Sequence, residues 1–67
     1  LSIYPNPTNG LINIISDLSI EEITLYSVDG QLIGTTIKRS ILLKIKGIYF
    51  VKIRTERGTI VRRVVVN

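Results

Sequence analysis

The 67-residue sequence contains no cysteine, histidine, methionine, tryptophan or alanine. Because cysteine is absent, no disulfide can stabilise the fold. Without cysteine and histidine, the common zinc sites, thiol nucleophiles and imidazole bases are also excluded. A domain of this length buries only about 60% of the surface that its unfolded chain exposes. The fold must therefore be held together by its hydrophobic core alone.

Long apolar segments are also missing. No apolar run approaches the ~20 residues that a membrane-spanning helix needs. The chain begins at Leu1 rather than at a methionine, and a strand-like pattern starts at once. We therefore expect residues 1–67 to form a single domain cut from a longer protein. If Asn67 is the natural end, the domain is the C-terminal one.

The composition favours β-structure. Isoleucine, valine and threonine make up 25 of the 67 residues, and β-branched side chains suit strands better than helices. Apolar residues alternate with period two, and turn residues recur at roughly 8–12-residue spacing, which is typical of an all-β sandwich or barrel. No connection is long enough for a parallel crossover. We predict two antiparallel sheets packed face to face, with a small open barrel as the alternative. The predicted strands are residues 1–4, 11–16, 23–27, 31–37, 41–45, 48–55 and 59–66.

Two predicted strands contain irregular positions. Gly34 lies inside the strand 31–37, where a glycine indicates a bulge or a close backbone approach. Arg62 and Arg63 are adjacent in the last strand, and a regular strand would turn one of them inward. We therefore predict either a β-bulge at this pair or a position at the open edge of the sandwich.

Charge is sorted along the chain. Residues 1–37 contain four acidic residues and no basic one, whereas residues 38–67 contain all nine basic residues and only Glu56 as an acid. The basic residues can be the solvated faces of strands, a docking surface for an acidic partner or an anionic glycolipid, or a nucleic-acid site. The few aromatic residues form no apparent stacking platform with interleaved basic residues, so we expect no nucleic-acid partner.

The carboxylates give no pattern that is typical of catalysis. Asp29 and Glu56 belong to turn motifs, and Glu21 and Glu22 form an acidic pair on a predicted loop. A hard cation needs several convergent oxygens, which this spacing does not supply. We expect no enzymatic activity, no metal and no cofactor.

Four motifs, taken in order, resemble the type IX secretion system C-terminal sorting domain, type A. The segment Tyr4-Pro5-Asn6-Pro7-Thr8-Asn9-Gly10 is similar to the family's YPNPxxG motif, and residues 23–33 resemble its Tyr-containing hairpin. Residues 47–53 look like its G-[IVL]-Y-[FIL]-V-[KR]-[IV] strand. Gly58 followed by residues 62–67 matches its ending, a basic pair before an aliphatic run. Residues 40–46 depart from the family pattern, because they lack its Asp or Asn.

The resemblance implies an immunoglobulin-like sandwich of about seven short strands that acts as a secretion signal in Bacteroidota-type bacteria. Such a domain directs its parent through the periplasm and the outer-membrane translocon to the cell surface or the extracellular space. The implied partners are the translocon, a shuttle protein and a sortase, with anionic lipopolysaccharide as an indirect one. Edge strands leave open a monomer or a strand-exchanged dimer.

The resemblance also supplies candidate site residues. The candidates for recognition by the translocon are Gly47, Tyr49, Val51, Gly58, Arg62, Arg63, Val64, Val65, Val66 and Asn67. The candidates in the opening motif are Tyr4, Pro5, Asn6, Pro7 and Gly10. A structural role for Gly47, Tyr49 and the proline turn is the competing interpretation. The competing function is an adhesive or carbohydrate-binding module, for which Tyr26 is the plausible exposed aromatic residue.

Overall fold

The computed structural model describes all residues from 1 to 67 and contains seven strands and no helix. This confirms the all-β prediction. In chain order the strands are β1 (Ser2–Tyr4), β2 (Leu11–Ile15), β3 (Ile20–Ser27), β4 (Leu32–Thr36), β5 (Ser40–Leu42), β6 (Gly47–Thr55) and β7 (Gly58–Val66). None of these elements is a helix with the length and apolarity needed to cross a membrane.

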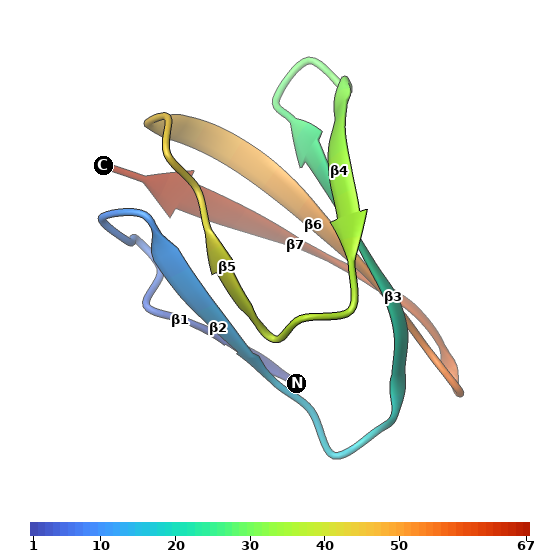
Figure 1. The fold of residues 1–67 in the computed structure, drawn as a ribbon. Helices are drawn as coiled ribbons and strands as arrows, with labels where there is room; N and C mark the ends of the chain where they lie inside the picture. Colours follow the sequence, from blue (N-terminus) through green and yellow to red (C-terminus); the bar gives the residue numbers. More distant parts are fainter.

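The strands form two antiparallel sheets with the orders β1-β2-β5 and β4-β3-β6-β7. Figure 1 shows the two sheets facing each other. After β4 in the second sheet, the chain crosses to the first sheet, where β5 pairs with β2, and then returns to the second sheet as β6. Crossings of this kind between two sheets are typical of immunoglobulin-like sandwiches. The sandwich prediction is therefore confirmed, and the open barrel is not adopted.

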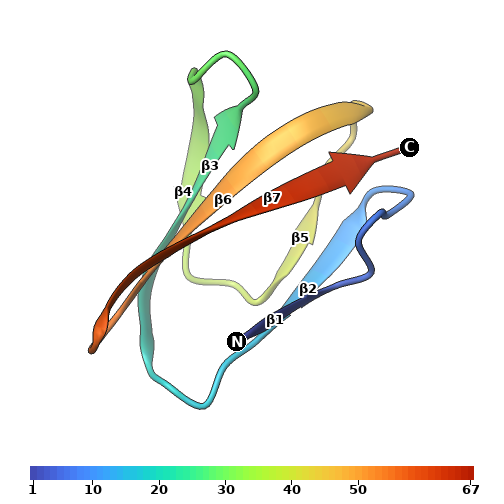
Figure 2. The same cartoon turned by 180° about the vertical axis from the view of Figure 1, so that it is seen from behind.

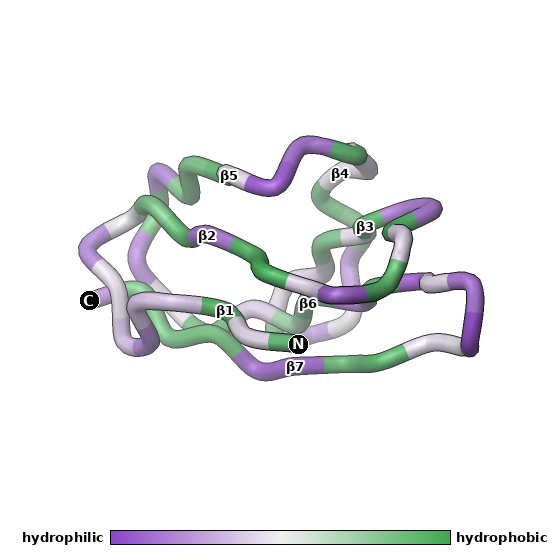
Figure 3. Tube along the Cα trace, turned by 90° about the horizontal axis from the view of Figure 1, so that it is seen from below, coloured by the Kyte–Doolittle hydropathy of each residue, from purple (hydrophilic) through white to green (hydrophobic).

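The core lies between the sheets. Along β6, Tyr49, Val51 and Ile53 face inward while Lys52 and Arg54 face water, as period-two alternation requires. Figure 3 shows hydrophobic stretches on strands of both sheets, on β2 and β5 of one sheet and on β7 of the other. The buried core residues are Ile12, Ile14, Ile23, Leu25, Leu43, Tyr49, Val51, Ile53, Val64 and Val66.

Several strand boundaries differ from the predicted ones. Strand β3 begins at Ile20, three residues earlier than expected, so the prediction of a loop at Glu21 and Glu22 was wrong. Pairing with β6 supplies the reason, because Ile20 pairs with Thr55 and the register shifts before Glu22. Strand β5 ends at Leu42 rather than at residue 45. The bulge predicted near Gly34 is present, since the register shifts where Leu25 faces Gly34 and Tyr26 faces Leu32.

The predicted bulge at Arg62 and Arg63 was wrong. Strand β7 pairs with β6 without a register shift, and Arg62 lies directly opposite the fully buried Val51. The alternative, a position at an edge, is correct, because β7 is the last strand of its sheet. Arg62 thus occupies an inward-facing position and remains exposed. A long side chain at a sheet edge can reach water past the strand, so no bulge is needed.

Candidate functional site

The last strand, β7, presents two different faces. Val64 and Val66 point into the core and are buried, and Ile60 on the same face is half-buried. Val61 and Arg63 point to the outer face and are exposed. The strand is therefore anchored through its aliphatic residues while its arginines stay accessible.

The backbone groups of β7 also alternate in direction. Thr55 and Gly58 flank the tight turn between β6 and β7. From Gly58 onward, every second residue of β7 directs its backbone N–H and C=O groups toward β6 in the antiparallel ladder. The residues between them direct their N–H and C=O groups away from the sheet. These are Thr59, Val61, Arg63 and Val65. This outward row of groups is called the outer edge of β7 below.

The segment after β1 covers the C-terminal part of this outer edge. The Asn6 side chain donates from Nδ2 to the Arg63 carbonyl at 2.8 Å and accepts from the Val65 N–H at 3.0 Å. The Thr8 N–H donates to the Val65 carbonyl and the Asn67 N–H donates to the Thr8 carbonyl, both at 2.9 Å. Figure 2 shows this segment beside the end of β7. The opening motif and the chain end therefore form one hydrogen-bonded unit.

The opening motif is shaped by its own turn chemistry. The hydroxyl of the buried Thr8 donates to the Leu11 carbonyl and accepts from the Gly10 N–H at 3.1 Å. Gly10 has a φ of 142°, and a Cβ there would lie 3.0 Å from the Leu43 carbonyl oxygen. Only glycine fits this backbone angle and this close approach. The peptide bonds preceding Pro5 and Pro7 are both cis.

The motif at the start of β6 has a structural explanation. Tyr49 is 8% exposed, and its hydroxyl donates to the carbonyl of Ile45, four residues upstream. This matches the tyrosine corner of immunoglobulin-like folds, in which a tyrosine near the start of a late strand bonds back to the preceding corner. Gly47 has a φ of 146°, which favours glycine. The pair fixes how the chain enters β6.

The candidate residues separate into exposed and buried groups. In the late strands, Gly47, Gly58, Arg62, Arg63 and Asn67 are exposed, Val65 is half-buried, and Tyr49, Val51, Val64 and Val66 are buried. In the opening motif, Tyr4, Pro5, Asn6 and Pro7 are exposed and Gly10 is buried. The structure brings the opening motif onto residues 63–67 and places Gly47 opposite Val66. Gly58 lies at the other end of β7, away from this group.

Sequence reasoning missed three features of the structure around β7. It did not identify Thr8 as a contact of the last strand, and it gave Asn6 no partner there. The two β7 residues that bond to Asn6 lie 57 and 59 positions away in the sequence, so no local pattern could reveal these contacts. It also missed that Tyr26, Phe50 and Arg63 are cross-strand neighbours on the outer face of the larger sheet.

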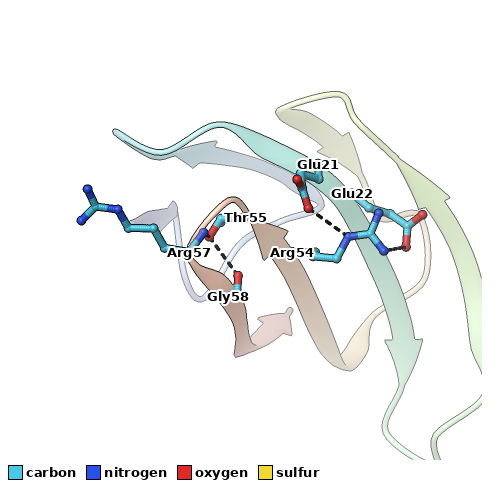
Figure 4. A network of polar contacts seen from close by, with 6 residues as sticks. All are labelled: Glu21, Glu22, Arg54, Thr55, Arg57 and Gly58. Carbon is cyan, nitrogen blue, oxygen red and sulfur yellow. Dashed lines mark hydrogen bonds and ion pairs between the residues drawn. The ribbon is translucent and has the colours of Figure 1, made fainter.

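The acidic pair on β3 has a basic partner. Arg54 Nε lies 3.3 Å from Glu21 Oε1, and Arg54 Nη1 lies 3.9 Å from Glu22 Oε1 (Figure 4). The register shift beside Glu22 lets both carboxylates reach the same guanidinium. These side chains are about half exposed, so each pair contributes only about 0–1 kcal/mol. Both ion pairs of the structure use Arg54, which leaves Arg62 and Arg63 without a carboxylate partner.

No group of three or more histidine, cysteine, aspartate or glutamate residues lies where it could hold a metal ion. A hollow of about 340 Å³ near Ile33, Ile45 and Tyr49 is mainly apolar, and Lys46 is its one charged lining residue.

One carboxylate has a shifted pKa. The Ser27 hydroxyl donates to the Asp29 carboxylate, and with the Asp29 and Gln31 backbone amides it holds the Asp29 pKa below its ordinary value of 3.8. Asp29 is fully exposed in the turn between β3 and β4. The shift therefore reflects turn chemistry rather than an active site.

Comparison with known proteins identifies a family. A family model described as a secretion system C-terminal sorting domain matches residues 2–67. No curated protein matches the sequence. The match covers the opening motif, the β6 motif and the terminal strand together.

Proposed function

The chain belongs to the family of type IX secretion system C-terminal sorting domains, and we propose that residues 62–67 are the part that the secretion machinery reads. Domains of this family are sorting signals for type IX secretion rather than enzymes. The parent protein is accordingly secreted to the cell surface or the extracellular space, and interaction with the type IX machinery follows from this role.

The observation that carries the proposal is the position of β7. It is an edge strand whose Arg62 and Arg63 side chains are exposed and lack carboxylate partners, while Val64 and Val66 are buried. An edge strand can be recognised by another protein through its backbone groups and its side chains together. The buried valines hold the strand in place, and the arginines provide the accessible charge.

The remaining candidate residues support this surface in the proposal. Tyr49 and Gly47 set the course of β6, the strand that pairs with β7, and Val51 is the cross-strand partner of Arg62. Pro5, Asn6 and Pro7 shape the turn that covers the chain end. Tyr4 and Gly10 border that turn, and Gly58 begins β7. These residues maintain the signal rather than contact the translocon.

The route of the parent protein completes the proposal. Residues 1–67 act as a single C-terminal domain of a larger protein, which passes through the periplasm and is then received by a shuttle protein and the outer-membrane translocon. A surface sortase removes the domain, and the cargo is released or attached to anionic lipopolysaccharide. In this proposal the domain itself catalyses nothing and binds no nucleic acid, and it acts as a monomer or as a strand-exchanged dimer.

An export assay tests the proposal. A reporter with an N-terminal signal peptide is fused to residues 1–67 and expressed in a type IX-competent host. We expect the reporter in the medium or on the cell surface, and loss of export when residues 62–67 are deleted. Retention of the intact, folded fusion in the periplasm would contradict the proposal.

A second variant separates recognition from folding, because the deletion also removes the core residues Val64 and Val66. Arg62→Gln combined with Arg63→Gln keeps both valines and removes only the charges. Export should fall several-fold while the circular dichroism spectrum stays unchanged. The matched control, Lys38→Gln with Arg39→Gln, removes two exposed charges between β4 and β5 and should be exported normally.

A further inference from the structure

The outer edge of β7 is covered only in part. Asn6 and Thr8 occupy the Arg63 carbonyl, both Val65 groups and the Asn67 N–H. The groups of Thr59 and Val61 and the N–H of Arg63 face the same side, where the sheet has no further strand. The first half of the edge is therefore open to a backbone partner, while the second half is closed by the chain itself.

Arg62 protects the open half. Its side chain starts on the inward-facing side of β7, and Nη1 reaches the Val61 carbonyl at 3.4 Å on the outer edge. An inward-pointing charged residue on an edge strand is a recognised way to prevent unwanted strand pairing. Here the guanidinium lies over the position that an added strand would take, and it has no carboxylate to neutralise it.

We propose that the open edge from Thr59 to Arg63 is a docking site for an extended acidic segment of a partner protein. This inference rests on the proposed function and locates the contact on β7. The added segment pairs with both backbone groups of Thr59, with the N–H groups of Val61 and Arg63 and with the Val61 carbonyl, as in strand addition. Its carboxylates neutralise Arg62 and Arg63, and the Arg62 guanidinium leaves the Val61 carbonyl to meet them.

Charge complementarity selects this partner over a second copy of the chain. Two β7 edges paired antiparallel around Val61 or Arg62 would bring the arginine pairs of the two copies together. Like charges on neighbouring strands are destabilising. Only a segment with carboxylates near Arg62 and Arg63 turns this repulsion into attraction.

Peptide binding to the 67-residue chain tests the inference. The probe is a nine-residue peptide of alternating threonine and glutamate, and the comparison peptide has lysine in place of glutamate. Amide hydrogen exchange is followed by NMR. The glutamate peptide should slow exchange at Thr59, Val61 and Arg63 by about tenfold or more, because these amides become hydrogen-bonded. The Val65 and Asn67 amides, which are already bonded, should change little.

Charge-reversed variants show whether the arginines select the peptide. Arg62→Glu combined with Arg63→Glu should reverse the preference, so that the lysine peptide protects the edge. The matched control, Lys44→Glu with Lys46→Glu, makes the same change in net charge at exposed positions between β5 and β6. It should still prefer the glutamate peptide. Equal protection by both peptides, or no protection of the unmodified chain, would overturn the inference.

Val61→Pro tests the backbone contact. Proline removes the outward N–H, and an edge strand tolerates it because that N–H has no partner within the sheet. Persistent protection of the Val64 amide shows that the variant is folded. Peptide protection at Arg63 should be lost. Unchanged protection would contradict strand addition.

The export assay separates this inference from the proposed function. If the unmodified fusion and a folded Val61→Pro fusion are exported equally, the docking site is refuted and the sorting function stands. If neither is exported while the glutamate peptide still protects Val61 in vitro, the proposed function fails and the docking site stands. Export of only the unmodified fusion supports both.

Discussion

The two edges of the larger sheet are protected in different ways. Strand β4 has only five residues, contains a bulge beside Gly34 and carries no charged side chain. Strand β7 has nine residues, is regular throughout and carries two arginines. Leu32 and Ile33 on β4 are at least half exposed, whereas β7 sends Val64 and Val66 fully into the core.

The comparison separates geometric protection from protection by charge. A short, bulged edge cannot pair with a long partner, whatever that partner's charge. A regular edge with unpaired arginines disfavours a basic or a neutral strand, because pairing would bury an arginine charge without a partner. The same edge can accept an acidic strand, which supplies that partner. Of the two edges, only β7 combines a long regular ladder with a barrier that a suitable partner can remove. Four predictions test this contrast.

The largest effect should come from truncating the inner face of β7. Val64 is fully buried, so Val64→Ala should destabilise the fold by about 1.5–3 kcal/mol through lost burial and a cavity. Leu32→Ala on β4 is the control, because Leu32 is 63% exposed and its loss should cost less than about 0.5 kcal/mol. Urea unfolding measures both. Equal losses would show that the two edges are anchored alike.

Removing the amide that covers the chain end should have the next largest effect. Asn6→Ala deletes two hydrogen bonds to β7 and should cost about 1–2 kcal/mol. The Val65 amide should then exchange faster, which NMR can follow. Asn9→Ala in the same turn is the control, because the exposed Asn9 side chain makes no hydrogen bond in the structure. Unchanged exchange at Val65 would contradict the role of Asn6.

Replacing Arg62 should change self-association more than the stability of the fold. Arg62→Val removes the inward charge of β7, and stability should change by less than about 0.5 kcal/mol. The variant should self-associate as concentration rises, which sedimentation can detect, because the open edge is no longer protected. Arg57→Val, at the exposed turn before β7, should stay monomeric. A monomeric Arg62 variant would show that geometry alone protects this edge.

The smallest effect concerns the turn that leads into β4. The folded-state pKa of Asp29 lies below its ordinary value of 3.8, so its ionised form contributes stability above that pH. The contribution is lost as the pH falls through the lower folded value. Between about pH 5 and pH 2, the melting temperature should therefore fall less for Asp29→Asn than for the unmodified chain. Identical pH profiles would contradict the hydrogen bond from Ser27.

Most of the fold could be predicted from local patterns. Alternation identified β6 almost to the residue, because inward Tyr49, Val51 and Ile53 are separated by polar positions. Glycine at turns and bulges located most hairpins. The early start of β3 was hidden, because Glu21 and Glu22 follow the register of a distant strand rather than a local pattern.

The site was predicted only in part. The terminal strand and the opening motif were both identified, but as separate features. Their contact joins residues from opposite ends of the chain through the Asn6 side-chain amide, and such a contact produces no periodic pattern in the sequence. For Arg62 and Arg63 the sequence left a bulge and an edge position open, because alternation alone does not show which strand lacks a neighbour. The structure has the edge position and no bulge.

The bridge between Thr8 and Val66 is parallel, and this has a mechanical consequence. When two parallel segments are pulled from opposite ends, the hydrogen bonds between them carry the load together rather than opening one at a time. A tension applied between Leu1 and Asn67 would therefore be resisted by all the Asn6 and Thr8 bonds to β7 at once. The contact between the opening motif and β7 therefore resists force best when a cargo attached before Leu1 pulls against a held C-terminus.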